Sequence, residues 1–96
     1  MFLEPVQGEG GIHVPSAGYL KRVKDVCVKH NVLLVADEVQ TGFGRTGKLM
    51  GCDHDFDGTG TKPDILVLAK SISGGFMPSS GIVADDHVME NMKIGE

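Results

Sequence analysis

Lys70 and Asp37 are the two residues whose types and positions point most directly to chemistry. Lys70 follows the apolar run 65–69. Asp37 follows the apolar run 32–36 and precedes Glu38. An ammonium group at the end of a buried strand is costly, because desolvation disfavours its charged form. Such a lysine is either neutralised by a partner or used as an amine nucleophile. The pattern therefore predicts the rim of an active site, with a buried Asp37–Lys70 ion pair as the competing interpretation.

A predominantly parallel sheet is predicted to position these residues. The order of apolar runs and loops predicts strand, helix, three strands and helix over residues 1–3, 16–31, 32–36, 65–69, 81–84 and 85–92. A continuous aliphatic run such as 32–36 is typical of a strand buried on both faces. Strand, helix and strand at this spacing indicate an α/β fold with a mostly parallel sheet flanked by helices. Asp37, Gln40 and Lys70 would lie beyond the carboxyl ends of the strands, where such sheets bind ligands.

The predicted helix 16–31 has Ser16 as its N-cap and ends at Asn31. Apolar side chains and one histidine recur in it at helical spacing, which is typical of ordinary core packing. These positions are Tyr19, Val23, Val26, Cys27 and His30. The charged positions are expected to face outward, and they are Lys21, Arg22, Lys24, Asp25 and Lys29.

Length, charge and cysteine content limit the class of protein. The 96 residues fit one small domain, carry a net charge of −4 and include no basic stripe that would bind nucleic acid. No apolar run approaches the roughly 20 residues of a membrane span. Cys27 and Cys52 are far apart, which favours free thiols in a reduced intracellular compartment. The abrupt start and end of the chain predict an interior piece of a longer protein.

The glycine-rich loop 42–48 resembles two phosphate-binding motifs, GxGxxG and GxxxxGK. A P-loop would need Ser or Thr where Leu49 stands. A dinucleotide-binding loop would follow its strand directly, whereas residues 37–41 intervene here. A nucleotide site is therefore only a minor alternative.

The acidic segment 53–64 imitates a calcium-binding loop, because carboxylates alternate over 53–57 and Asp64 occupies the twelfth position. However, Pro63 precedes that last ligand, and a predicted strand follows where an EF-hand has a helix. A solvated acidic loop is the favoured interpretation, with a calcium-binding module as the alternative. The four histidines are scattered, and no other metal site is predicted.

A lysine, a carboxylate and glycine-rich loops together favour one cofactor chemistry. A lysine amine can form a Schiff base with pyridoxal phosphate, and a carboxylate can keep the pyridinium nitrogen protonated. Four segments carry a resemblance that agrees with this chemistry: EPVQGEGG at 4–11, LVADEVQTGFGRTG at 34–47, KPDI at 62–65 and LAKSISGG at 68–75. On these motifs the chain resembles the class III pyridoxal-phosphate-dependent aminotransferases over essentially its whole length.

The resemblance implies roles for five residues. Lys70 would carry the cofactor and then move the proton between the substrate carbon and the cofactor carbon. Asp37 would pair with the pyridine nitrogen, so that the two side chains bracket a ring without touching. Gln40 would contact the phenolic oxygen, and Val39 would pack against the ring face. Glu9 would lie near the substrate, where the matching glutamate of ornithine aminotransferases masks an arginine.

The resemblance also implies a reaction. Within the family it is strongest to enzymes that transfer the δ-amino group of ornithine to 2-oxoglutarate, giving glutamate 5-semialdehyde and glutamate. Gly10 stands where many of these enzymes carry alanine, so acetylornithine and 4-aminobutyrate are alternative amino donors. The substrates would be a small amino acid and a 2-oxo acid.

The same resemblance implies how the chain fits into a larger protein. Residues 1–96 would be a fragment of the large cofactor-binding domain of a fold-type I enzyme, with no second domain in the chain. The full-length protein would form a homodimer or higher homo-oligomer in the mitochondrial matrix or the cytoplasm. The substrate arginine, contacts from the neighbouring subunit and the small domain would lie outside these residues, so we expect the isolated fragment to be inactive.

Overall fold

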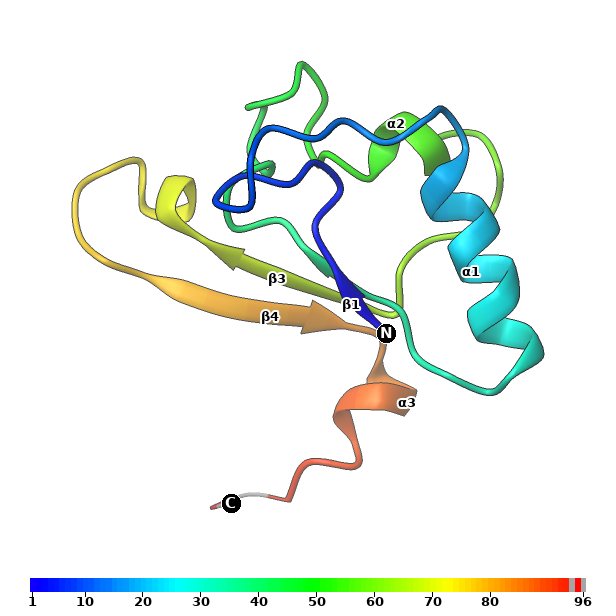
Figure 1. The fold of residues 1–96 in the computed structure, drawn as a ribbon. Helices are drawn as coiled ribbons and strands as arrows, with labels where there is room; N and C mark the ends of the chain where they lie inside the picture. The colour runs from blue at the N-terminus through cyan, green and yellow to red at the C-terminus, as the bar shows by residue number, and fades with distance from the viewer. Residues whose placement is uncertain (94, 96) are drawn as a thin grey trace.

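The computed structural model describes residues 1–93 and 95. These residues form a four-stranded sheet with short helices beside it (Figure 1). Across the sheet the strands are β1 (Phe2–Leu3), β2 (Val35–Asp37), β3 (Ile65–Ala69) and β4 (Ser80–Ala84). The first three run parallel, and β4 returns antiparallel to β3. Asp37 lies beside Val67, three residues before Lys70. The predicted α/β fold with a mostly parallel sheet is confirmed.

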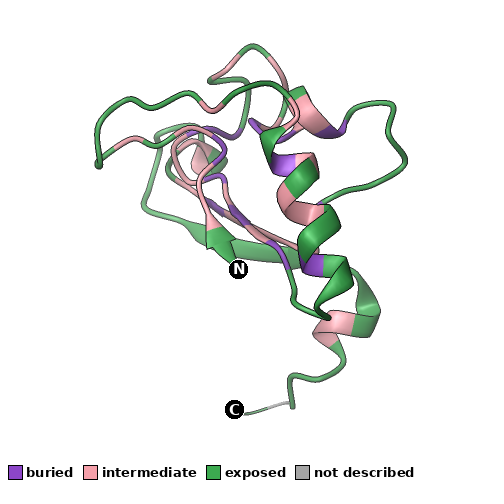
Figure 2. Cartoon of the chain, turned by 45° about the vertical axis from the view of Figure 1, so that its right-hand side comes forward, coloured by how far each residue is buried: buried purple, intermediate pink, exposed green. Residues whose placement is uncertain are grey.

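Two helices lie on the same side of this sheet (Figures 1 and 2). They are α1 (Tyr19–Lys29), which connects β1 to β2, and the one-turn helix α2 (Asp53–Phe56), which lies between β2 and β3. A 3-10 turn, η1 (Lys70–Ser73), follows β3, and α3 (Asp86–Met89) follows β4. The last helix is shorter than predicted: it ends at Met89, and Met92 lies beyond it. No helix within residues 1–93 and 95 is long and apolar enough to cross a membrane.

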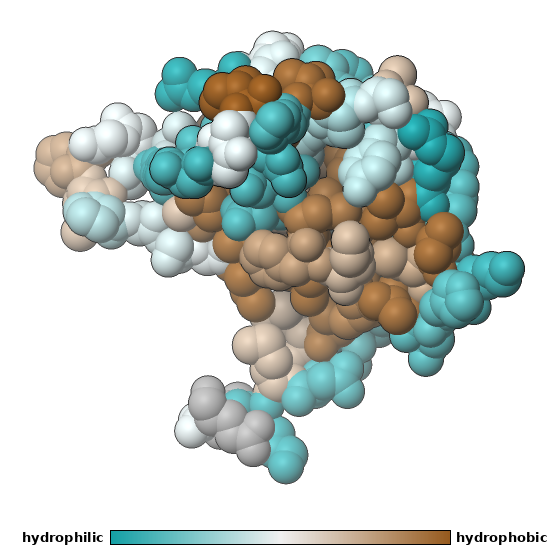
Figure 3. Space-filling model, in the orientation of Figure 1, coloured by the Kyte–Doolittle hydropathy of each residue, from teal (hydrophilic) through white to brown (hydrophobic). Residues whose placement is uncertain are grey.

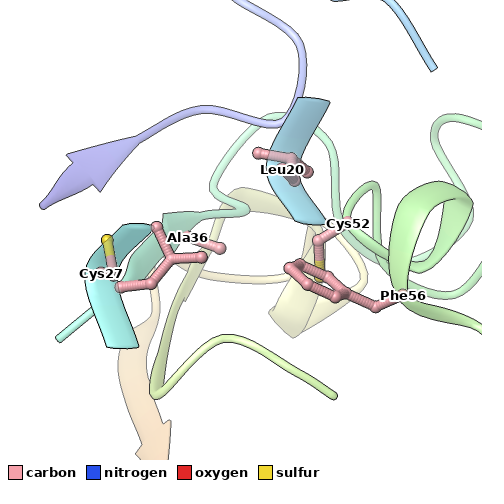
Figure 4. Packing of buried hydrophobic residues seen from close by; sticks show 6 residues of the cluster. Leu20, Cys27, Ala36, Cys52 and Phe56 are labelled. Atoms are coloured by element: carbon pink, nitrogen blue, oxygen red, sulfur yellow. The ribbon is translucent and has the colours of Figure 1, made fainter. Parts of the chain in front are cut away.

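The core lies between the sheet and these two helices (Figure 4). Successive side chains of a strand point to opposite faces, so Leu34 and Ala36 share the face that α1 and α2 cover. The buried cluster comprises Leu20, Cys27, Leu34, Ala36, Cys52 and Phe56. The two cysteines are free thiols, as predicted. Burial raises the pKa of the Cys52 thiol, and the nearby Glu38 carboxylate raises it further.

Much of the sheet remains uncovered, contrary to the prediction of strands buried on both faces. Phe2, Ile82 and Val83 are exposed. Val32 and Leu33 are also exposed, and they precede β2 as irregular chain, so the predicted strand 32–36 begins later than expected. The reason is that both core helices pack on one face, and no described element covers the other.

An apolar groove runs beside α1, where the prediction of ordinary core packing is wrong for part of the stripe. Val26 is 58% exposed and Tyr19 is also exposed, whereas Cys27 is buried. With Met1 and Val32 these residues line a groove of about 460 Å³. Figure 3 shows apolar surface gathered near the N-terminus, between β1 and α1.

The start of α1 differs from the sequence prediction. The helix begins at Tyr19, after Gly18 in the left-handed conformation (φ 73°), and Ser16 does not cap it. Instead, the Asp55 carboxylate accepts hydrogen bonds from the backbone N–H groups of Gly18 (2.7 Å) and Leu20 (2.8 Å). A carboxylate near a helix N-terminus satisfies its unpaired donors and interacts favourably with its dipole. A residue 35 positions away therefore takes the place of the predicted local cap.

The end of α1 agrees with the prediction that the helix stops at Asn31. Asn31 adopts a left-handed conformation (φ 53°). The N–H of Val32 donates to the carbonyl of Cys27 (2.9 Å), and the N–H of Asn31 donates to that of Val28 (3.2 Å). These two bonds form a Schellman motif, which satisfies carbonyls at the helix end.

The acidic segment 53–63 is not the fully solvated loop that was predicted. Its first four residues form α2, because Phe56 enters the core and Asp55 binds the start of α1. Within the described residues no group of histidine, cysteine and carboxylate side chains is arranged to hold a metal ion. The calcium-loop alternative therefore has no structural support.

Candidate active site

Lys70 stands at the carboxyl end of β3 in a strained backbone conformation. Its φ is 49°, in the left-handed region that residues other than glycine rarely adopt. Strain of this kind costs on the order of 1–3 kcal/mol, and it clusters at functional sites. Ala69 is still extended and η1 begins at Lys70, so the chain turns sharply there. The side chain is exposed, and the predicted burial of its ammonium group is wrong for this chain.

Lys70 lines a cavity of about 420 Å³ together with Val39 and Gln40. This volume falls within the range of about 300–1,000 Å³ that is typical of small-molecule sites. The loop after β1 supplies another part of the wall, including Gly8 and Ile12. Three of the five predicted site residues thus come together, because the carboxyl ends of the parallel strands β2 and β3 meet at one edge of the sheet.

Asp37, at the end of β2, lines a different cavity of about 620 Å³. Its Oδ1 accepts a hydrogen bond from the N–H of Val39 (3.1 Å), and its Oδ2 accepts none from the described residues. Gln7 lines both this cavity and the one that contains Lys70. None of the ion pairs in the described part of the chain joins Asp37 to Lys70, so the ion-pair interpretation is wrong.

Glu9 does not line the Lys70 cavity itself and is connected to it through the side chain of Gln40. The Nε2 group of Gln40 donates a hydrogen bond to Oε1 of Glu9 (3.1 Å). Glu9 lies in a loop that is closed by two backbone hydrogen bonds between Gln7 and His13, of 3.1 and 3.4 Å. The β1 loop and the β2 loop are therefore joined at the predicted substrate and cofactor residues.

Glu38 organises the glycine-rich loop that follows β2. Its side chain is 0% exposed. Its Oε2 accepts hydrogen bonds from the Thr41 hydroxyl and from the N–H of Gly51 (2.8 Å), and its Oε1 accepts one from the N–H of Cys52 (2.7 Å). No cation pairs with it among the described residues, so these three donors compensate its burial.

Sequence reasoning placed no role on Glu38 beyond its adjacency to Asp37. The donors that hold it come from residues 41 and 51–52, and nothing in the local pattern indicates that they return to it. Thr46 was also missed. Its hydroxyl oxygen is buried without a hydrogen-bond partner, and the residue lines the Lys70 cavity. A buried unpaired hydroxyl costs about 1–3 kcal/mol, which a bound polar group can offset.

The glycine-rich loop 42–48 does not form a phosphate cradle. Its Gly44 N–H donates to the carbonyl of Leu49 (3.1 Å), and its Gly47 N–H donates to that of Gly44 (3.0 Å). These donors are used within the loop, whereas a phosphate-binding loop aims several at its ligand. The nucleotide alternative therefore has no support in this geometry.

Comparison with known proteins decides the family. A family model described as "Aminotransferase class-III" matches residues 1–96. The chain belongs to the class III aminotransferases. It is 53% identical over 94 residues to a probable mitochondrial ornithine aminotransferase of Caenorhabditis elegans. The aligned region covers 98% of this chain and 21% of that protein. The chain thus spans about a fifth of the length of the curated relatives it matches.

Solved structures of class III aminotransferases share this fold. Ornithine δ-aminotransferase of Plasmodium falciparum matches with a TM-score of 0.91 and 54% identity over 99% of this chain and 24% of that one. Acetylornithine aminotransferase of Elizabethkingia anophelis matches with a TM-score of 0.90 and 48% identity, over 99% of this chain and 23% of that one. The ornithine aminotransferase of Toxoplasma gondii matches with a TM-score of 0.90 and 50% identity, over 98% of this chain and 21% of that one. That structure is described with partial occupancy of pyridoxal phosphate at its active site.

The arrangement in this class III chain fits pyridoxal phosphate. Lys70 offers an amine to an aldehyde at the mouth of a cavity of suitable volume. Thr46, whose buried hydroxyl oxygen has no hydrogen-bond partner among the described residues, lines the same cavity. Oδ2 of Asp37 accepts no hydrogen bond from residues 1–93 and 95, which suits a protonated ring nitrogen. The amine and the carboxylate are the groups that such a cofactor requires, but Lys70 and Asp37 line neighbouring cavities that share Gln7, and the expectation that they bracket one ring stays a prediction.

Proposed function

We propose that the full-length protein containing this chain is a pyridoxal-phosphate-dependent ornithine aminotransferase. It transfers the δ-amino group of ornithine to 2-oxoglutarate, giving glutamate 5-semialdehyde and glutamate. The observation that carries the proposal is the position of Lys70: a strained, exposed lysine that borders one cavity with Val39 and Gln40. Family membership and the cofactor described for the Toxoplasma gondii relative support pyridoxal phosphate.

Each site residue has a distinct task in this proposal. Pyridoxal phosphate, when bound, supplies an electron sink for the charge left on the substrate carbon by proton removal. The Lys70 amine would hold the cofactor and, when free, would take up and return that proton. Asp37 would hold a proton on the ring nitrogen through Oδ2, the oxygen that accepts no hydrogen bond from the described residues. Gln40 would donate a hydrogen bond to the phenolic oxygen, and Val39 would pack against the ring.

Glu9 is proposed to select the amino donor. Its hydrogen bond to Gln40, which lines the Lys70 cavity, places a carboxylate next to that cavity. As in the enzymes it resembles, the carboxylate would mask an arginine from elsewhere in the protein, so that the side-chain amine of ornithine rather than its α-amine reaches the cofactor. Acetylornithine and 4-aminobutyrate are alternative donors, since an acetylornithine aminotransferase shares 48% identity with this chain.

The rest of the active site is proposed to lie elsewhere in the protein. Residues 1–96 form part of the large cofactor-binding domain, and the relatives they match are about five times longer. We propose a homodimer or higher homo-oligomer that acts on an amino acid and a 2-oxo acid. Its compartment is the mitochondrial matrix or the cytoplasm, since curated relatives include mitochondrial ornithine aminotransferases.

The test uses the full-length protein loaded with pyridoxal phosphate. Its absorbance spectrum should contain the band of a lysine-bound cofactor, and Lys70→Ala should abolish both that band and transamination. Lys62→Ala is the matched control, because Lys62 pairs with Asp85 at the surface and lines none of the cavities around the site. Retention of the band in Lys70→Ala would overturn the assignment.

The amino donor is tested separately. Ornithine, acetylornithine and 4-aminobutyrate are each assayed as the amino donor, with 2-oxoglutarate as the acceptor in every assay. The value of kcat/KM should be highest for ornithine. A higher kcat/KM for either alternative would correct the substrate and leave the reaction class in place.

A further inference from the structure

We propose that Gly8 is a positioning residue for Gln40, an inference that rests on the proposed function because it concerns the contact of Gln40 with the cofactor. The absence of a side chain at Gly8 lets the Gln40 amide lie against the backbone of the β1 loop. Both residues line the Lys70 cavity. The space left at Gly8 thereby permits the orientation from which Gln40 would reach the phenolic oxygen of pyridoxal phosphate.

The contact is too close to accommodate a side chain at Gly8. A Cβ atom there would lie 2.9 Å from Cδ, Nε2 and Oε1 of Gln40. Carbon atoms in favourable contact are about 3.5–4.0 Å apart, so one partner would have to move by about 1 Å. The φ of Gly8 is not positive, so its backbone conformation is open to alanine and the conflict concerns the Gln40 amide.

The Gln40 amide is the partner that yields. Both polar backbone groups of Gly8 are engaged: its N–H donates to Oε2 of Glu4 (2.8 Å), and its carbonyl accepts from the N–H of Gly11 (3.1 Å). Among the described residues the Gln40 amide makes one hydrogen bond, to Glu9, and it lies at the end of a flexible side chain. A methyl group at position 8 therefore displaces the amide and leaves the loop in place.

Gly10 provides a matched control in the same loop. A Cβ atom at Gly10 would have no neighbour within 4 Å, and its φ is not positive either. Gly8→Ala and Gly10→Ala thus make the same chemical change, with the same effect on the flexibility of the unfolded chain. They differ in the contact with Gln40.

The experiment titrates the full-length apoprotein with pyridoxal phosphate. Gly8→Ala should weaken binding about ten-fold, the effect of losing one hydrogen bond to the cofactor, while Gly10→Ala stays within about two-fold. Gly8→Ala should also shift the pH midpoint of the bound-cofactor absorbance in the same direction as Gln40→Ala. In the Gln40→Ala background, Gly8→Ala should add no further effect, because the group it displaces is gone.

Two results would overturn the inference: a Gly8→Ala dissociation constant equal to that of Gly10→Ala, or an undiminished effect in the Gln40→Ala background. A crystal structure of the Gly8→Ala apoprotein separates this inference from the proposed function. It should show the Gln40 amide displaced by about 1 Å and the loop backbone unmoved. A moved loop with an unmoved amide refutes the positioning role, whereas failure of the wild type to bind pyridoxal phosphate refutes the proposed function.

Discussion

At the scale of single residues, Asp37 and Glu38 show how neighbours of the same chemical type take different tasks. Asp37 is half-buried, and one of its carboxylate oxygens has no donor in the part of the chain that the structure describes. Glu38 is fully buried, and both of its oxygens are occupied. Side chains alternate across a strand and its continuation, so one carboxylate faces a cavity and the next enters the interior. The first is available to a ligand, and the second holds the loop.

Glu38→Gln should destabilise the full-length protein by about 1–3 kcal/mol, because an amide NH₂ replaces one acceptor oxygen and leaves a buried donor unpaired. The free energy of unfolding from urea denaturation measures this change. Glu90→Gln is the control, since Glu90 is exposed. Equal stability of the two variants would show that the three donors to Glu38 have other partners in solution.

At the scale of elements, α1 is held at its start by a residue distant in the sequence and at its end by the turn that follows it. Asp55 of α2 binds its first N–H groups, and Asn31 closes its last turn. Near its middle, Lys24 Nζ pairs with Asp64 Oδ1 (2.7 Å), and Asp64 Oδ2 accepts from the N–H of Leu34 (2.7 Å). Lys24 was predicted to face outward, but its side chain is only 12% exposed. These contacts fix α1 over β2 and β3.

Asp55→Ala should cost about 1–2 kcal/mol of stability, the usual value for losing a helix cap, since two N–H groups at the start of α1 lose their acceptor. Thermal unfolding of the full-length protein measures it. Ser16→Ala, at the cap predicted from sequence, should change stability by less than about 0.5 kcal/mol, because Ser16 does not cap α1. The reverse order would favour the local cap over the tertiary one.

The Lys24–Asp64 pair should give the protein an acid-sensitive contribution to stability. Partial burial acts to raise the pKa of Asp64, but the hydrogen bonds from Lys24 and Leu34 and the charge of Lys24 outweigh it and hold the pKa below its ordinary value of 3.8. A lowered pKa stabilises the fold above the unfolded-state pKa, and this contribution is lost as pH falls through the folded-state pKa.

Asp64→Asn should therefore lower the unfolding free energy by about 2 kcal/mol at pH 7, and the difference from wild type should shrink as pH falls below about 4. Urea denaturation of the full-length protein at stepped pH measures both values. Asp25→Asn removes the exposed pair with Lys21 and should have little effect at any pH. A difference that is independent of pH would contradict the assigned pKa direction.

At the scale of the whole molecule, the sheet is covered on one face and the predicted active site is open. The Lys70 cavity is bordered by loops at one edge of the sheet, and the neighbouring loop carries Phe76, which is 93% exposed. An apolar groove also runs beside α1. Catalysis by an amine and an electron sink needs water excluded from the reacting atoms, and an open cavity does not exclude it.

The isolated 96-residue segment should therefore show no detectable transamination of ornithine with 2-oxoglutarate, whereas the full-length protein turns over in the same assay. A coupled assay for glutamate, run on both proteins with saturating pyridoxal phosphate, makes the comparison. Turnover by the segment alone would show that residues 1–96 contain a complete site.

Sequence alone was sufficient for the family and for most of the elements. The strand Ile65–Ala69 has the predicted bounds, and the end of α1 follows from the left-handed preference of Asn31. Both are local properties, in which apolar runs and turn residues act on their own neighbours. The segment 53–63 was predicted less well, because Phe56 forms a helix only by packing into a core made from distant residues.

For the site, sequence by itself determined which chemistry is present: an amine at Lys70, a carboxylate at Asp37 and an amide at Gln40, each after a predicted strand. Only the tertiary structure decided how they are distributed, with Lys70 and Gln40 in one cavity and Asp37 in another. It also decided that Gly8 lies against the Gln40 amide. Residue types carry reactivity, and apolar runs predict that the strand ends meet at one edge of the sheet. The division into cavities and the close contact at Gly8 arise from the packing of loops far apart in the chain, which no local pattern encodes.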